Sequence, residues 1–148
     1  MIWPQKPADI LFVEDDPKNV EIAMAAFRER NISKHIVRVV DASGALDFIA
    51  YLDVLAERTH SSLPRFILMN LHLRNANGME LLEQIKFHET TCHVPVVLFA
   101  RNLSAVELIV SYKLGVNSCV IRPPSPEKFG QIVGDIALYW LNINQLPV

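Results

Sequence analysis

The stretch Ile10-Leu-Phe-Val-Glu-Asp-Asp-Pro17 places four apolar residues directly before three acids and a proline. A continuous apolar run of this length is typical of a strand that is covered on both faces of a parallel sheet. Asp16 followed by Pro17 is a helix start signal, because aspartate caps a helix and proline fits its first position. The stretch therefore predicts a strand, a short acidic loop and a helix in immediate succession.

The same pattern of an apolar run followed by a helical segment recurs four more times. The further runs occupy residues 36–40, 66–69, 94–99 and 119–121. Strict alternation of this kind predicts an α/β fold, a doubly wound, five-stranded parallel sheet with helices on both faces. The common strand order for such a flavodoxin-like fold is 2-1-3-4-5, with ligands bound beyond the carboxyl ends of strands 1 and 3.

Length and composition limit the classes of protein that need to be considered. The 148 residues are 51% hydrophobic and 20% charged, with a formal net charge of -2. We expect a single domain over residues 1–148, with a core of about 8–140 and a carboxy-terminal extension of about 141–148. No excess of positive charge favours nucleic acid, and no apolar run approaches the roughly 18 residues of a membrane span. Two cysteines form no disulfide framework, which favours a cytoplasmic location.

Polar residues follow the predicted strands and define a candidate site. They are Glu14 and Asp15 after the first strand, Asn70 after the third, Ala100 after the fourth and Arg122 after the fifth. Because the carboxyl ends of parallel strands share one edge of the sheet, these residues should line one crevice. Two adjacent carboxylates suit an oxygen-preferring ion such as Mg²⁺. The alternative is that Asp16 caps the helix while Glu14 and Asp15 are solvated loop acids; placement at a strand end favours the site.

Four motifs at matching separations resemble the receiver domain of bacterial two-component response regulators. They are Leu11–Pro17, Ile67–Leu73 together with Gly78, Pro95–Ala100, and Val120–Pro123, and the resemblance runs from about residue 10 to 140. The last segment, Leu138–Pro147, resembles the end of single-domain regulators that accompany bacterial phytochrome kinases. The resemblance implies a receiver fold. It also implies contact with a histidine kinase, such as one of the phytochrome type, or with another receiver.

The departures from the receiver pattern concern the chemistry of the site. The resemblance implies an aspartate that accepts a phosphoryl group where this chain has Asn70, a hydroxyl residue at Ala100, an aromatic residue at Cys119 and a lysine at Arg122. Only the acid pair, Glu14 and Asp15, is kept. An uncharged amide cannot replace a carboxylate as the nucleophile.

These departures predict a divergent, non-enzymatic pseudo-receiver that acts through protein–protein interaction. We expect Asn70 and Arg122 to imitate a partly neutralised site, with Arg122 paired with Asp15 or Glu14 in place of a cation. Mg²⁺ should then be absent or weakly bound. The alternatives are a receiver phosphorylated on a different acceptor and a flavodoxin-like mononucleotide-binding module. A phosphatase of the haloacid dehalogenase type is disfavoured, because the chain lacks an Asp-x-Asp pattern and a cap insertion.

Apolar residues continue to the end of the chain. Trp140 extends the apolar stripe of the last predicted helix, Tyr139 and Leu141 flank it, and Ile143 and Leu146 follow. An apolar segment beyond the expected domain edge favours an interface over exposure to solvent. We therefore predict a homodimer that uses these five residues.

Overall fold

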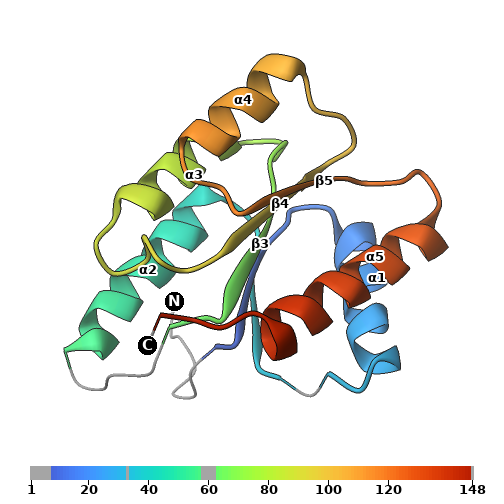
Figure 1. Cartoon of the computed structure of the whole chain (residues 1–148), viewed down its shortest axis with the longest axis horizontal. Helices are drawn as coiled ribbons and strands as arrows, with labels where there is room; N and C mark the ends of the chain where they lie inside the picture. Colours follow the sequence, from blue (N-terminus) through green and yellow to red (C-terminus); the bar gives the residue numbers. More distant parts are fainter. Residues whose placement is uncertain (1–7, 33, 58–62, 148) are drawn as a thin grey trace.

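The computed structural model describes residues 8–32, 34–57 and 63–147, and they form one parallel sheet covered on both faces (Figure 1). The strands are β1 (Ile10–Val13), β2 (Ile36–Val39), β3 (Phe66–Asn70), β4 (Val96–Ala100) and β5 (Ser118–Ile121). All neighbouring strands pair in parallel, and their order is β2-β1-β3-β4-β5. The predicted fold class and strand order are confirmed.

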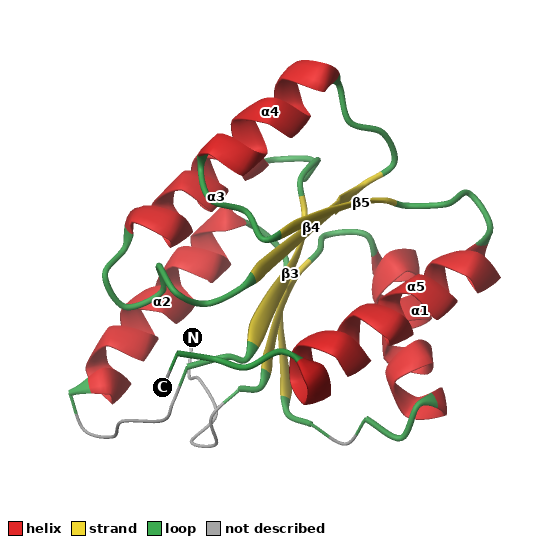
Figure 2. Cartoon of the chain, viewed as in Figure 1, coloured by secondary structure: helices red, strands yellow, loops and turns green. Residues whose placement is uncertain are grey.

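Helices alternate with the strands and divide between the two faces of the sheet. They are α1 (Pro17–Glu29), α2 (Ala42–Ala56), α3 (Gly78–Phe87), α4 (Ala105–Lys113) and α5 (Pro126–Leu138), followed by the π-helical turn η1 (Tyr139–Ile143). Helices α1 and α5 lie together on one face, while α2, α3 and α4 lie on the other (Figure 2). Among the described residues, no helix is long and apolar enough to cross a membrane.

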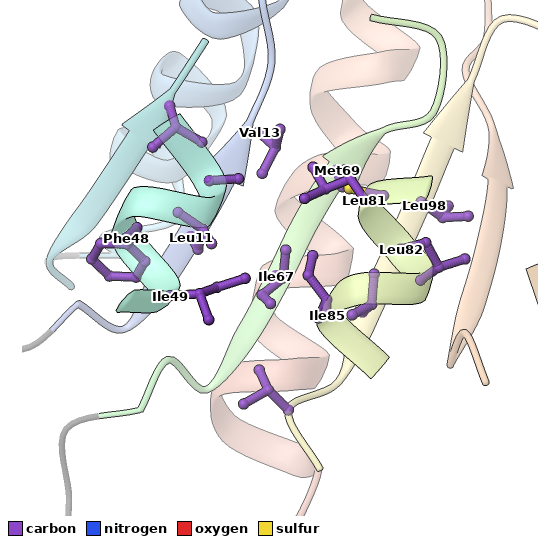
Figure 3. Close-up of a cluster of buried hydrophobic side chains, with 14 of the residues drawn as sticks. Leu11, Val13, Phe48, Ile49, Ile67, Met69, Leu81, Leu82, Ile85 and Leu98 are labelled. Atoms are coloured by element: carbon purple, nitrogen blue, oxygen red, sulfur yellow. The ribbon is translucent and has the colours of Figure 1, made fainter. Parts of the chain in front are cut away.

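Two hydrophobic cores lie on opposite sides of the sheet, and alternate residues of each central strand enter them. In β1, Leu11 and Val13 enter the core beneath α2 and α3, whereas Ile10 and Phe12 enter the core beneath α1 and α5. Figure 3 shows the first of these cores, with side chains of β1, β3 and β4 packed against α2 and α3. Burial on both faces explains why the strands are continuous apolar runs rather than alternating ones.

The loops at the carboxyl ends of the strands are held by local capping interactions. Asp16 caps α1 by accepting a hydrogen bond from the Lys18 backbone N–H at 2.9 Å. Ser104 and Glu107 form a reciprocal capping box at the start of α4. At Gly78 a Cβ atom would lie 2.1 Å from the Leu71 carbonyl oxygen, so only glycine lets the loop after β3 approach α3 this closely.

The carboxy-terminal end departs from the predicted single apolar helix. The α-helix ends at Leu138, and the next turn widens into a π-helix that Asn144 closes by donating its backbone N–H to the Tyr139 carbonyl at 2.8 Å. This turn buries Leu141 to 4% exposure in the α1/α5 core, so Leu141 belongs to the packed domain rather than to an exposed interface. The packed core therefore includes Leu141, the first residue of the predicted extension of about 141–148.

The other residues of the predicted interface differ in their exposure. Trp140 packs partly buried against the α1/α5 core, with its ring edge-on to that of Tyr139. Leu146 is half-buried. Tyr139 and Ile143 are exposed, at 45% and 63%. The segment thus offers two exposed apolar side chains instead of the predicted five.

Candidate functional site

A crevice of about 310 Å³ lies at the carboxyl ends of β1, β3, β4 and β5. Its lining residues are Asp15, Asp16, Asn19, Asn70, His72, Arg74, Phe99, Ala100, Arg101, Asn102 and Arg122. Four of the predicted site residues, Asp15, Asn70, Ala100 and Arg122, are therefore brought together by the sheet. Glu14 is buried and touches the crevice only through Asn70 and Asn19. Cys119 instead packs half-buried against the α2/α3 core, where burial raises the pKa of its thiol.

Glu14 is a fully buried acid whose carboxylate accepts four hydrogen bonds. Its two oxygens accept from Asn70 Nδ2 at 3.1 and 3.2 Å, one accepts from Asn19 Nδ2 at 3.1 Å, and the other accepts from the Asp16 backbone N–H at 3.0 Å. Burial raises the pKa of Glu14 above its ordinary value, although the hydrogen bonds oppose this effect. The alternative reading of Glu14 as a solvated loop acid is wrong, because the side chain is buried. Its predicted role in a metal site stays a prediction.

Asn70 has both polar atoms of its amide engaged. Its Nδ2 donates to the Glu14 carboxylate, and its Oδ1 accepts the His72 backbone N–H at 2.9 Å. The orientation of the amide follows from these partners, since a carboxylate only accepts and a backbone N–H only donates. Asn70 therefore fixes the end of β3 to the buried acid of β1 and to its own following loop.

The Asp15 side chain reaches the loop after β3. One carboxylate oxygen of Asp15 accepts the Arg74 backbone N–H at 2.7 Å, and the side chain lines the crevice. The two members of the acid pair thus have different surroundings, one buried among amides and one at the crevice wall. Asp15 joins the β1 loop to the β3 loop across the crevice.

Arg122 does not pair with either acid, and the predicted Arg122–carboxylate contact is wrong. In the described part of the chain no ion pair involves this side chain. Its guanidinium lies over the Phe129 ring at 5.3 Å from the centroid, and its Nε is buried without a hydrogen-bond partner. The physical reason is that Asn70 and Asn19 already satisfy Glu14, so the buried acid needs no cation.

The residues of the crevice do not fit a tight divalent-cation site. Glu14 is saturated by donors, Asn70 turns its nitrogen toward Glu14, and Asp16 caps α1. Asp15 is the one acid of the pair that lines the crevice. Over residues 8–32, 34–57 and 63–147, no cluster of three or more His, Cys, Asp or Glu side chains is placed to hold a metal ion. Mg²⁺ usually needs one or two carboxylates together with further oxygen ligands.

Sequence reasoning missed several residues of the site. Asn19 follows Glu14 by five positions and faces it from the first turn of α1, a spacing that could have indicated the contact. Arg74 and Arg101 reach the crevice from loops, and loop residues have no periodic sequence pattern from which their position could be predicted. His72 Nε2 lies 2.7 Å from Glu107 Oε2 and links the β3 loop to the start of α4. The hydrogen bonds from Ser104 and His72 lower the pKa of Glu107.

This sheet order, with an acid pair after β1 and polar residues at the ends of β3 and β5, defines a receiver-type domain. The family model of the response regulator receiver domain matches residues 10–134, and the chain belongs to this family. The chain is 35% identical over 143 residues to the probable methanogenesis regulatory protein FilR2 of Methanothrix harundinacea, covering 97% of this chain and 90% of the relative.

Two further response regulators are also similar. Response regulator Rcp1 of Synechocystis is 27% identical, with 95% of this chain and 94% of Rcp1 covered. The Mn²⁺-bound structure of Rcp1 superposes with a TM-score of 0.79 over 96% of this chain and 100% of that one. The structure of the phosphorylated cyanobacterial phytochrome response regulator RcpA gives the same TM-score at 27% identity, over 95% and 99% of the two chains. The chain is thus a two-component receiver domain related to phytochrome response regulators.

Proposed function

We propose that this protein is a pseudo-receiver, which keeps the receiver fold but does not accept a phosphoryl group at the end of β3. The observation that carries the proposal is the Asn70 amide, whose two polar atoms are engaged by Glu14 and by the His72 backbone. An amide nitrogen is delocalised into its carbonyl, so Asn70 supplies no nucleophile for phosphoryl transfer. The protein is accordingly a signalling module that works by protein contact and not an enzyme.

Two further positions support the loss of phosphoryl chemistry. Ala100, at the end of β4, has no hydroxyl that could donate to a phosphoryl oxygen. Arg122 is stacked on Phe129, so its guanidinium is not placed beside the acids. We also propose that Mg²⁺ binds weakly if at all. Titration with Mg²⁺ should leave the side-chain amide NMR signal of Asn70 unsaturated at millimolar ion, and tight saturation would contradict this expectation.

The partner in this proposal is a histidine kinase of the phytochrome type or another receiver, met in the cytoplasm. The support is the likeness to Rcp1 and to the phytochrome response regulator RcpA. A receiver without a phosphoacceptor can compete with other receivers for such a partner without accepting its phosphoryl group. Binding should therefore be independent of acetyl phosphate.

The decisive experiment compares the wild type with Asn70→Asp after incubation with acetyl phosphate and Mg²⁺, read by intact mass. Asn102→Asp is the matched control, because it adds a carboxylate to the same crevice at an exposed loop position. We expect one added phosphoryl group on Asn70→Asp and none on the wild type or the control. A phosphoryl group on the wild type would overturn the proposal, and mapping it would identify a different acceptor.

We further propose a homodimer formed through the exposed part of the carboxy-terminal segment. Tyr139 and Ile143 are its exposed apolar side chains. The Tyr139→Ser/Ile143→Ser variant should be monomeric by light scattering where the wild type is dimeric. The control is Val106→Ser/Ile109→Ser on α4, where two apolar residues are also exposed. Dissociation of the control alone would place the interface on α4 and refute the carboxy-terminal one.

A further inference from the structure

Lys86, near the end of α3, differs from the other described lysines in its surroundings. It is half-buried, whereas the others are exposed. The exposed ones are Lys18, Lys34, Lys113 and Lys128. The methylene stem of Lys86 packs beside the turn at Gly115, where a Cβ atom would lie 3.8 Å from Lys86 Cγ and Cδ. The side chain is therefore held between α3 and the turn that leads into β5.

The amine of Lys86 has two acceptors, and both are uncharged. Its Nζ donates to the Val94 carbonyl oxygen at 2.9 Å and to Asn117 Oδ1 at 2.8 Å. Within the described residues, the amine has no third acceptor and no ion-pair partner. Burial lowers the pKa of this amine, and the nearby Cys92 thiol opposes the shift only in part.

Two acceptors match the neutral form of the amine as well as the charged one. An ammonium carries three N–H donors, and here the third is left to solvent. A neutral amine carries two N–H groups, so both can be donated while the nitrogen lone pair points away from the two acceptors. Asn117 is exposed, so a small reagent can reach the amine beside it. Lys86 thus combines a nucleophilic form with a route of approach.

We propose that Lys86 is an acylation site, which takes an acetyl group from an activated donor, either an acyl phosphate or a thioester. The lone pair of Nζ attacks the acyl carbon and forms a carbon–nitrogen bond. The bond from that carbon to phosphate oxygen or to thiol sulfur breaks, phosphate or thiol leaves, and the amine loses one proton to water. This inference goes beyond the proposed function, because Lys86 does not line the crevice.

Acylation changes how α3 is attached to the sheet. The nitrogen of the resulting amide keeps one N–H, so it can donate to only one of the two acceptors. Val94 lies just before β4 and Asn117 just before β5, and Asn117 Oδ1 also accepts the Val96 backbone N–H at 2.9 Å. Loss of the charge and of one hydrogen bond therefore weakens a contact between α3 and the amino-terminal ends of these two strands.

The test compares acetylation rates of individual lysines in the full chain, at limiting acetyl phosphate and, separately, at limiting acetyl-coenzyme A. Mass spectrometry of peptides cut at glutamate measures the acetyl group on each lysine. We expect Lys86 to be acetylated several times faster than the four exposed lysines. Preference for Lys86 with one reagent alone identifies that class of donor, and preference with both identifies activated acyl groups in general. A rate at Lys86 no higher than at the exposed lysines, with both reagents, would overturn the inference.

Asn117→Asp tests the surroundings of the amine directly. One carboxylate oxygen can accept both hydrogen bonds that Asn117 Oδ1 now accepts, so the fold is kept. Its negative charge favours the ammonium and should slow acetylation of Lys86 several-fold. Lys113→Arg, at an exposed position of α4, is the matched control and should leave the rate at Lys86 unchanged.

Urea unfolding verifies that both variants are folded before their rates are compared. An unchanged rate at Lys86 in folded Asn117→Asp would overturn the inference, because the amine would then not depend on its uncharged acceptors. Intact mass distinguishes acetyl from phosphoryl adducts in the same reaction with acetyl phosphate. A phosphoryl adduct on the wild type would overturn the proposed function alone, whereas absence of preferred acetylation would overturn the acylation site alone.

Discussion

The two halves of the crevice differ in how their charged groups are accommodated. In the β1/β3 half, Glu14 is buried and saturated by Asn70, Asn19 and a backbone N–H. In the β4/β5 half, Ala100 contributes no polar group and Arg122 keeps a buried Nε without a partner. Neutral amides donate to the acid, whereas Arg122 lies over the Phe129 ring. The charge of the first half is satisfied by neutral donors, and that of the second rests on an aromatic ring.

The largest effect should come from Asn70→Asp. This change places a second carboxylate against buried Glu14 and removes the amide donor, so we expect a loss of about 2–4 kcal/mol in unfolding free energy at pH 7 without metal. The pKa of Glu14, already raised by burial, should rise further. A raised carboxyl pKa contributes stability that is present below the unfolded value and lost as pH rises through the folded value.

The deficit of Asn70→Asp should therefore be smaller at pH 4 than at pH 7. Urea unfolding in EDTA at the two pH values measures it. Asn102→Asp, which adds a carboxylate at an exposed position of the same crevice, should change stability by no more than about 0.5 kcal/mol. An equal, pH-independent decrease in unfolding free energy in both variants would show that a carboxylate beside Glu14 costs no more than one at an exposed position of the crevice.

A smaller effect is expected from Asn19→Ala. The substitution removes one of the donors to Glu14 and should cost about 1–2 kcal/mol in urea unfolding. It should also raise the pKa of Glu14, because that hydrogen bond favours the ionised form. Lys18→Ala at the neighbouring exposed position is the control. If Asn19→Ala were as stable as the control, the hydrogen bond from Asn19 to Glu14 would not contribute to the stability of the fold.

Arg122→Met should change stability by less than about 1 kcal/mol, since it removes a contact with the Phe129 ring and no ion pair. Breaking a buried ion pair would instead cost about 3–5 kcal/mol. Urea unfolding at pH 7 distinguishes the two cases. A decrease of about 3–5 kcal/mol in the unfolding free energy would show that Arg122 forms a buried ion pair that stabilises the fold.

The smallest expected effect concerns two acids with different surroundings, Glu14 and Glu107. Glu14 should titrate above its ordinary pKa because it is buried, and Glu107 below it because Ser104 and His72 donate to it. Carbon-13 NMR of the side-chain carboxyl groups follows both. His72→Ala should move the pKa of Glu107 upward and leave that of Glu14 in place. Titration of both acids on the same side of the ordinary value would contradict the proposed environments.

The sheet could be predicted from sequence because its strands are uniformly apolar and its helices carry recognisable caps, such as Asp16 and Ser104. Membership of the crevice followed from the convergence of strand ends. The partners inside it did not, because Glu14 could be satisfied by Arg122 or by amides, and only side-chain geometry decides between them. The π-helical turn was missed because its residues continue the apolar pattern of an ordinary helix.

The buried position of Glu14 also limits the substitutions that position 70 can accept. While that acid is enclosed by Asn70 and Asn19, a single substitution of Asn70 by aspartate should give a less stable protein. Restoring a phosphoacceptor would require a compensating change around Glu14, or a cation present from the outset. The stability of this site thus restricts which residues position 70 can carry.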